Sequence, residues 1–233
     1  MSRGRRINRI KLKPWDEAKL HRYRLDWDAK DLLRDPDEFP RLTSEALFGN
    51  RRPLEVEIGA GSGEMLVSLA KQSPGTNFLG IEVSHRAAIY AASLAADAQL
   101  GNLRILRANF KMLIPLLEPN SWERAYLHFP DPVHKRRDIK RSIFTAGFLD
   151  AMASTLLPGG ELSVASDKPE FFFAMLELAE DDGRFERACA ARYQEGLQTL
   201  VKSRFQLFWE RKGIRTLSFL LRKKPVGQPS AAA

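Results

Sequence analysis

The hydrophobic pattern after Pro53 alternates between two periods. Short apolar runs of strand length occur at residues 54–58, 77–83, 102–107, 124–129 and 161–166. Between them, apolar side chains recur at helical spacing over residues 65–72, 85–99 and 139–157, and Gly or Pro residues end these stretches. Strands and helices that alternate at this spacing predict parallel β-α-β crossovers, and hence an α/β fold with helices on both faces of an open sheet.

Shorter elements follow residue 166. A helix is predicted at residues 169–181, strands near residues 185–191 and 214–221, and a further helix that ends near Gly213. With these two strands the predicted sheet is seven-stranded and mostly parallel. Ligands of such sheets bind at the carboxyl ends of the strands.

The two ends of the chain differ from this regular centre. Residues 1–52 are polar and are broken by three prolines, so we interpret them as a basic N-terminal extension, partly helical around residues 16–33 or flexible. Residues 53–224 form the predicted domain, and residues 225–233 a disordered tail.

The composition narrows the class of protein. The 233-residue chain is 44% hydrophobic and 28% charged, as is typical of soluble globular proteins. No apolar run reaches the ~18 residues of a membrane span, and the first residues lack the apolar core of a secretory signal. We therefore expect a cytoplasmic protein without a membrane partner. Cys189 is the single cysteine and the histidines show no metal-ligand spacing, so neither a disulfide nor a metal site is predicted.

The net charge of +8 is concentrated in three segments. Residues 1–13, 134–141 and 202–224 carry +6, +4 and +7, which leaves −9 for the rest of the chain. A solvated surface would be an equally good interpretation of any one basic run. Three runs on an acidic body favour a nucleic-acid partner, because contacts with phosphates release counterions and dominate affinity.

A glycine-rich turn joins the first predicted strand to the helix after it. Gly59, Gly61 and Gly63 permit unusual backbone angles and let a ligand approach the backbone. A dinucleotide fingerprint would require glycine at position 64, where this chain has Glu64. Glu57 would also repel a diphosphate, whereas it suits the ammonium group of an amino acid. The turn therefore favours S-adenosylmethionine over a nicotinamide dinucleotide, and an oxidoreductase is the weakest interpretation.

Polar residues follow the next two predicted strands. Glu82 ends the second strand, where a carboxylate can accept both hydroxyl groups of an adenosine ribose; considered alone, it would be a surface acid. Asn109 follows the third strand, at the place where such folds recognise an adenine edge. Phe110 either stacks on the adenine or belongs to the core.

A proline-flanked acid follows the fourth predicted strand. Pro130 and Pro132 limit the backbone on both sides of Asp131, so this carboxylate loses little entropy when it meets a ligand. An ordinary Asp-Pro turn is the alternative interpretation. The position after a strand of the predicted sheet favours a positioned, reactive group.

Four motifs thus follow one another over residues 54–222. They are E-I-G-x-G-x-G, G-I-E-V, F-P-D-P-x-x-K-x-R-x-x-K-R and a strand that ends at Ser166-Asp167. In this order they resemble the bacterial tRNA (guanine-N7-)-methyltransferase family, and the F-P-D-P loop is the most specific of them. The resemblance implies a Rossmann-like class I methyltransferase fold, S-adenosylmethionine as cofactor, tRNA as partner and N7-methylguanosine as product. It also implies that one chain suffices, so a monomer is expected.

The resemblance also implies roles for individual residues. The cofactor would be bordered by Glu57, Gly59, Gly61, Gly63, Glu82, Asn109, Phe110 and Asp131, with Asp131 as the catalytic residue. The substrate would be contacted by Lys135, Arg137, Lys140, Arg141 and Asp167, and by Ser203 and Gln206 of a segment that matches the family's T-x-[FY]-E motif.

Three positions depart from the family's usual pattern. Val133 replaces the usual Trp, Asn109 the usual Asp, and Gln206 the usual Glu. Asn109 presents a donor as well as an acceptor, and Gln206 supplies no negative charge. These departures leave a catalytically silent RNA-binding relative as one alternative. A small-molecule methyltransferase is another, although it leaves the three basic segments unexplained.

Overall fold

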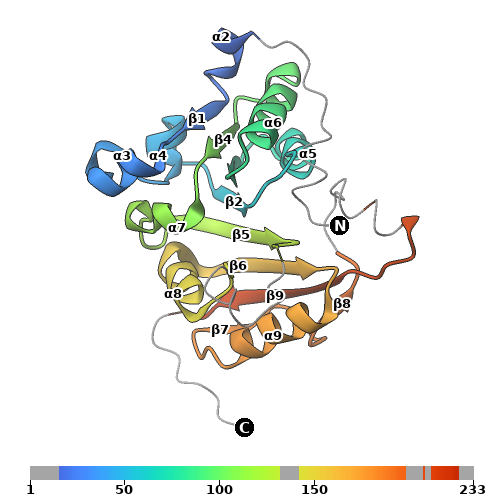
Figure 1. Ribbon diagram of the computed structural model, residues 1–233. Helices are drawn as coiled ribbons and strands as arrows, with labels where there is room; N and C mark the ends of the chain where they lie inside the picture. Colours follow the sequence, from blue (N-terminus) through green and yellow to red (C-terminus); the bar gives the residue numbers. More distant parts are fainter. Residues whose placement is uncertain (1–15, 132–141, 198–206, 208–210, 226–233) are drawn as a thin grey trace.

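A central sheet organises the molecule (Figure 1). The structure, a computed structural model, describes residues 16–131, 142–197, 207 and 211–225. Within these residues the sheet has nine strands in the order β1-β4-β3-β2-β5-β6-β9-β7, and β8 also pairs with β9. The strands are β1 (Arg24–Asp26), β2 (Leu54–Ile58), β3 (Asn77–Glu82), β4 (Leu103–Arg107), β5 (Trp122–His128), β6 (Leu156–Ser166), β7 (Phe185–Arg187), β8 (Gln194–Glu195) and β9 (Leu217–Lys223).

The sheet is parallel over most of its width. Strands β1 to β6 pair in parallel with their neighbours, whereas β9 runs antiparallel to β6, and β7 and β8 run antiparallel to β9. Every residue of β3 is buried, because both faces of this part of the sheet are covered. The parallel arrangement brings the carboxyl ends of β2 to β6 to one edge of the sheet.

Helices cover both faces, as the alternating pattern predicts. Helices α2, α5 and α6 pack with β3 and β4 in one apolar cluster, and α3, α7, α8 and α9 contribute to a larger cluster. The helices are α2 (Glu17–Leu20), α3 (Ala29–Arg34), α4 (Ser44–Phe48), α5 (Glu64–Gln72), α6 (His85–Asp97), α7 (Phe110–Leu113), α8 (Ala146–Thr155) and α9 (Pro169–Glu180), with the 3-10 turns η1 (Pro36–Glu38) and η2 (Ile114–Leu116). In Figure 1, α5 and α6 lie together on one side and α7 and α8 on the other. None of the helices in the described part of the chain has both the length and the apolar character needed to cross a bilayer.

The α/β class and the mostly parallel sheet predicted from the sequence are confirmed, with a different strand count. Nine strands are described instead of seven, because β1 and β8 add to the sheet. Strand β1 lies within residues 16–33, where we expected helix; that expectation is wrong for residues 24–26. The helix expected over residues 139–157 is described only as α8, and part of its range lies outside the described residues.

The described part of residues 1–52 packs into the main core. Trp27, Leu32 and Leu42 belong to the same apolar cluster as the strands of the sheet. The indole Nε1 of the fully buried Trp122, on β5, donates a 2.8 Å hydrogen bond to the carbonyl oxygen of Leu42. Residues before the glycine turn therefore contribute to the folding of the sheet itself.

A polar pair lies between β2 and β5, the two central strands. The Tyr126 hydroxyl donates a 2.5 Å hydrogen bond to Oε2 of Glu55, and Tyr126 is only 2% exposed. Burial, followed by the neighbouring Glu55 carboxylate, raises the pKa of Tyr126 well above its ordinary value. The folded protein thus holds this phenol proton at a pH where the unfolded chain releases it.

Tyr126→Phe should therefore change the pH dependence of stability. Near pH 7 we expect the free energy of unfolding of the variant to be about 1 kcal/mol lower than that of the wild type, because a buried hydrogen bond is lost. Above pH ~10 the wild type should lose stability faster than the variant, by up to about 1.4 kcal/mol per pH unit, because ionisation of the unfolded tyrosine draws the equilibrium toward unfolding. Urea unfolding from pH 7 to 11 measures the difference, with the exposed Tyr193→Phe as control. A constant gap over this range would contradict the assignment.

Candidate active site at the carboxyl edge of the sheet

The predicted site residues come together where the order of the strands reverses. From β2 the chain proceeds outward through β3 and β4, and then returns to add β5 and β6 on the other side of β2. Ligands of open α/β sheets bind at such a switch point. The glycine turn follows β2 and the Pro-Asp-Pro loop follows β5, and these strands pair directly, with Glu57 opposite Tyr126. The two sequence motifs therefore leave the sheet side by side.

The backbone of the glycine turn adopts left-handed angles. The φ values of Gly59, Gly61 and Gly63 are +80°, +59° and +74°, a region in which side chains are strained. A Cβ atom on Gly63 would also lie 2.5 Å from Cβ of Ala91 on α6. The N–H groups of Gly59 and Ala60 donate to the carbonyl oxygen of Ile81 on β3, at 2.8 and 3.0 Å. Glycine is thus required here both by backbone conformation and by close packing.

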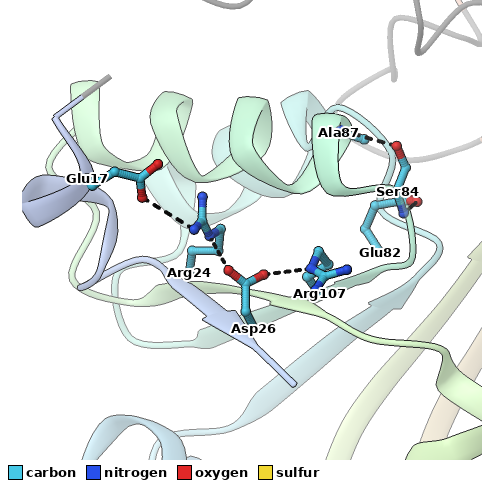
Figure 2. A network of polar contacts seen from close by, with 7 residues as sticks. All are labelled: Glu17, Arg24, Asp26, Glu82, Ser84, Ala87 and Arg107. Atoms are coloured by element: carbon cyan, nitrogen blue, oxygen red, sulfur yellow. Dashed lines mark hydrogen bonds and ion pairs between the residues drawn. The ribbon is translucent and has the colours of Figure 1, made fainter. Parts of the chain in front are cut away.

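Glu82 holds this turn through its side chain. Its Oε2 accepts a 2.7 Å hydrogen bond from the Gly61 N–H, and its Oε1 accepts a 2.8 Å bond from the Ser84 N–H. Ser84 in turn caps α6 by accepting from the Ala87 N–H (Figure 2). Glu82 is 5% exposed, so its charge is buried and is stabilised by these two donors. Sequence reasoning found this residue but missed its structural role, because nothing in the sequence indicates which backbone groups a carboxylate will reach.

Glu57 is the second buried carboxylate beside the turn. It lies on β2, two residues after Glu55 and one residue before the strand ends, and is 3% exposed. Residues 57–64 contain two further polar side chains, Ser62 and Glu64, but no Lys or Arg. The turn segment itself therefore carries negative charge, which suits a cationic group and disfavours a diphosphate.

The residues after β4 divide between the surface and the core. Asn109 is exposed, and its Oδ1 accepts a 3.1 Å hydrogen bond from the Lys111 N–H, which caps α7. Phe110 is 5% exposed and packs edge-on against Phe148, with ring centroids 5.9 Å apart, as in the core alternative that the sequence left open.

Val83, which sequence reasoning did not select, is 67% exposed directly after Glu82. The sequence signal for Val83 is its position directly after Glu82, at the end of the second predicted strand.

The Pro-Asp-Pro loop begins with an unusual backbone. Phe129 has a φ of +54°, which is rare for a bulky residue and costs about 1–3 kcal/mol. Its N–H donates a 2.7 Å bond to the carbonyl oxygen of Ala165 on β6, and its ring, 3% exposed, packs with Ala165 and Leu197. The preceding His128 is also buried, with Nε2 2.9 Å from the Ser163 hydroxyl. These contacts turn the chain at the end of β5, so that Pro130 is buried and Asp131 is exposed.

The described substrate candidate on the neighbouring strand is Asp167. It follows β6 directly, its side chain is 9% exposed, and its Oδ2 lies 3.7 Å from Nζ of Lys168. The remaining predicted substrate residues lie outside the described residues: Lys135, Arg137, Lys140, Arg141, Ser203 and Gln206. Among the residues that the structure describes, no group of three or more His, Cys, Asp or Glu side chains is arranged to hold a metal ion.

Comparison with known proteins identifies the family. Residues 51–215 match a family model described as "Putative methyltransferase". A tRNA (guanine-N(7)-)-methyltransferase of Rubrobacter xylanophilus is 40% identical over 209 residues, which cover 90% of this chain and 94% of that protein. A protein of the same name from Chloroherpeton thalassium is 36% identical over 222 residues, which cover 95% of this chain and 98% of that protein. The chain belongs to the tRNA (guanine-N(7)-)-methyltransferase family.

Solved structures support the fold of this family member. The 16S rRNA methyltransferase KamB aligns with a TM-score of 0.56 at 16% identity, over 79% of this chain and 96% of that chain. At such low identity the likeness concerns the fold alone. The Rossmann-like class I methyltransferase fold implied by the sequence resemblance is thus confirmed, and so is the family.

Glu82→Gln tests the structural role of Glu82 in this family member. A glutamine has a single acceptor oxygen, so its NH2 group would face one of the two N–H donors that the carboxylate now satisfies. We expect the free energy of unfolding of the ligand-free protein to fall by about 1–3 kcal/mol. Urea denaturation without ligand provides the measurement, with the exposed Glu45→Gln as control. If Glu82 served only to meet a ligand, the stability of the ligand-free protein would not change.

Proposed function

We propose that this protein transfers the methyl group of S-adenosylmethionine to N7 of a guanine in tRNA. The observation that carries the proposal is the pairing of β2 with β5, which brings the glycine turn and the Pro-Asp-Pro loop to one switch point. The family supports the reaction, since the two relatives reported above are named for it.

The described residues around the turn fit S-adenosylmethionine. The glycine turn keeps side chains away from the backbone, and the buried Glu57 and Glu82 offer negative charge for a ligand that carries an ammonium and a sulfonium group. We infer that Glu57 binds the ammonium group and that Glu82 accepts the ribose hydroxyls with the lone pairs left by its two backbone bonds. When bound, the cofactor supplies an electrophilic methyl group on sulfur.

The adenine would lie beyond Glu82, over the ends of β3 and β4. Exposed Val83 offers an apolar contact there. Because the Oδ1 of Asn109 caps α7, the side-chain NH2 group remains as a donor for a ring nitrogen. Phe110, buried against Phe148, would support this loop from below and would not stack on the adenine.

The chemistry at guanine requires positioning more than proton transfer. N7 carries an in-plane lone pair and no proton, so its attack on the methyl group needs no general base. The exposed Asp131 and the nearly buried Asp167 would accept hydrogen bonds from N1–H and the 2-amino group of guanine. Their negative charge favours the transition state, because positive charge moves from sulfur to the base.

The acceptor RNA would be bound largely through phosphates. N7 faces the deep groove of A-form RNA, which side chains enter poorly, so we expect the target guanine in a loop or a tertiary contact. Cations of the first two basic segments, residues 1–13 and 134–141, would contact neighbouring phosphates. Lys135, Arg137, Lys140 and Arg141 belong to the second of these segments. In the third segment, Arg222 pairs with Glu161, and the buried Lys223 donates to the carbonyl oxygen of Leu156 at the start of β6, so these two cations stabilise the sheet.

The direct test is incubation of the protein with methyl-labelled S-adenosylmethionine and bulk tRNA, followed by nucleoside analysis. Labelled N7-methylguanosine is the expected product. Cofactor binding without transfer would support the catalytically silent relative. Transfer to small metabolites but not to tRNA would support the small-molecule methyltransferase.

Asp131→Ala should remove most of the activity. We expect kcat to fall by about a hundredfold or more, because a positioned charge at the reacting base is lost. The circular dichroism spectrum should stay close to that of the wild type, since Asp131 is exposed. Turnover near the wild-type rate would rule out the assigned role.

Substitutions at Asn109 should separate its cap from its cofactor contact. Asn109→Ala should lower the free energy of unfolding by about 1 kcal/mol, because the N-cap of α7 is lost, and should weaken binding of S-adenosylmethionine. Asn109→Asp keeps the cap but replaces the NH2 donor by a second acceptor oxygen, so stability should remain near the wild type while affinity falls as in Asn109→Ala. Thermal unfolding and calorimetric titration measure the two effects. An Asn109→Asp variant that binds as tightly as the wild type would show that the amide NH2 does not contact the cofactor.

A further inference from the structure

We propose that Asp26, on the edge strand β1, is a positioning residue for the cofactor site. It holds the carboxyl end of β4 through Arg107 (Figure 2). Asn109 follows two residues after Arg107. The inference rests on the proposed function, because it assumes that Asn109 meets the adenine. Nothing in the motifs of the sequence points to Asp26, which precedes the glycine turn by more than thirty residues.

Backbone hydrogen bonds align β1 along β4 to the end of that strand. The pairing places Arg24 opposite Ile105 and Asp26 opposite Arg107. Ile105 donates its N–H to the carbonyl oxygen of Tyr23 at 2.7 Å, and Trp27 donates to that of Arg107 at 3.2 Å. Strand β1 is therefore bonded to β4 up to the residue at which β4 ends.

Side chains strengthen the same junction. Oδ1 of Asp26 accepts a 2.9 Å bond from Nε of Arg107, and Oδ2 lies 2.8 Å from Nε of Arg24. Arg24 also pairs with the exposed Glu17 at 3.3 Å. Figure 2 shows Asp26 between the two guanidinium groups. Without Asp26, two cations would face each other at the end of β4, and Arg107 would lose its partner there.

The chain after β1 continues alongside the segment that follows β4. The Trp27 ring packs on Phe39, with centroids 5.2 Å apart, and belongs to the same core cluster as Ala108 and Phe110. Farther on, Leu42 donates a 3.1 Å backbone bond to the carbonyl oxygen of Leu116. Residues 107–116, which include Asn109, are thus held by the N-terminal segment at both ends.

The other side of this segment is tied to the ribose site. The Ala108 N–H donates a 3.2 Å bond to the carbonyl oxygen of Glu82, whose side chain holds the glycine turn. Asp26 therefore acts on the cofactor through Arg107 and the backbone of Ala108, and touches no cofactor atom itself. Its loss should allow the loop at Asn109 to move relative to Glu82.

The test compares Asp26→Ala with Glu17→Ala in the full-length protein. Both variants remove a carboxylate partner of Arg24, but only Asp26 also contacts β4. We expect calorimetric titration to give a dissociation constant for S-adenosylmethionine that is about three- to fivefold higher for Asp26→Ala, the range for a partly exposed ion pair, and unchanged for Glu17→Ala. Hydrogen exchange in the ligand-free protein should accelerate for amides 106–113 and remain unchanged for amides 59–66. If Asp26→Ala fails to fold, Asp26→Asn, which keeps one acceptor oxygen, replaces it with the same expectation.

A double-mutant cycle tests the route through Arg107. Arg107→Ala should weaken binding as much as Asp26→Ala, and the double variant should be no worse than either single one. Additive losses, or unchanged affinity of Asp26→Ala in a wild type that binds the cofactor, would overturn the inference and leave the proposed function intact. A wild type that does not bind S-adenosylmethionine would instead refute the proposed function.

Discussion

A carboxylate removed from water must have its charge met by hydrogen bonds, and Glu82 meets this requirement with two backbone N–H groups. The bond to Gly61 fixes a turn whose left-handed angles only glycine adopts readily, and the bond to Ser84 fixes the start of α6. The same side chain thus joins the glycine turn, the end of β3 and the start of α6. The conformation of the glycine turn and the start of α6 therefore depend on this one buried charge and its two hydrogen bonds.

The sequence was most informative where local pattern and tertiary structure agree. Residues 77–82 of the apolar run at 77–83 form a fully buried strand, and the glycine turn lies where the change of period placed it. Strand β1 could not be predicted, because its three residues gain their stability from pairing with β4 and not from local propensity. Likewise, no pattern distinguishes a phenylalanine in the core from one that stacks on a ligand, and the packing of Phe110 on Phe148 is known only from the structure.

Charge has two separate roles in this molecule. The described body contains buried carboxylates, such as Glu57 and Glu82, at the edge where a cationic cofactor would bind. The cationic segments are concentrated near the chain ends and after the Pro-Asp-Pro loop, which itself leaves the same edge of the sheet. Under the proposed function, the carboxylates would bind a positively charged cofactor and the cations a polyanionic acceptor, so neither ligand would compete for the contacts of the other.

Phe129 has a left-handed backbone, so the geometry of the candidate catalytic loop depends on the contacts that hold Phe129 in place. Its backbone cost is offset by the bond to Ala165 and by the packing of its ring, and both depend on intact pairing of β5 with β6. Local opening at the end of β5 would break these contacts without unfolding the whole sheet. The protein should therefore lose activity at a lower temperature than the one at which its sheet unfolds.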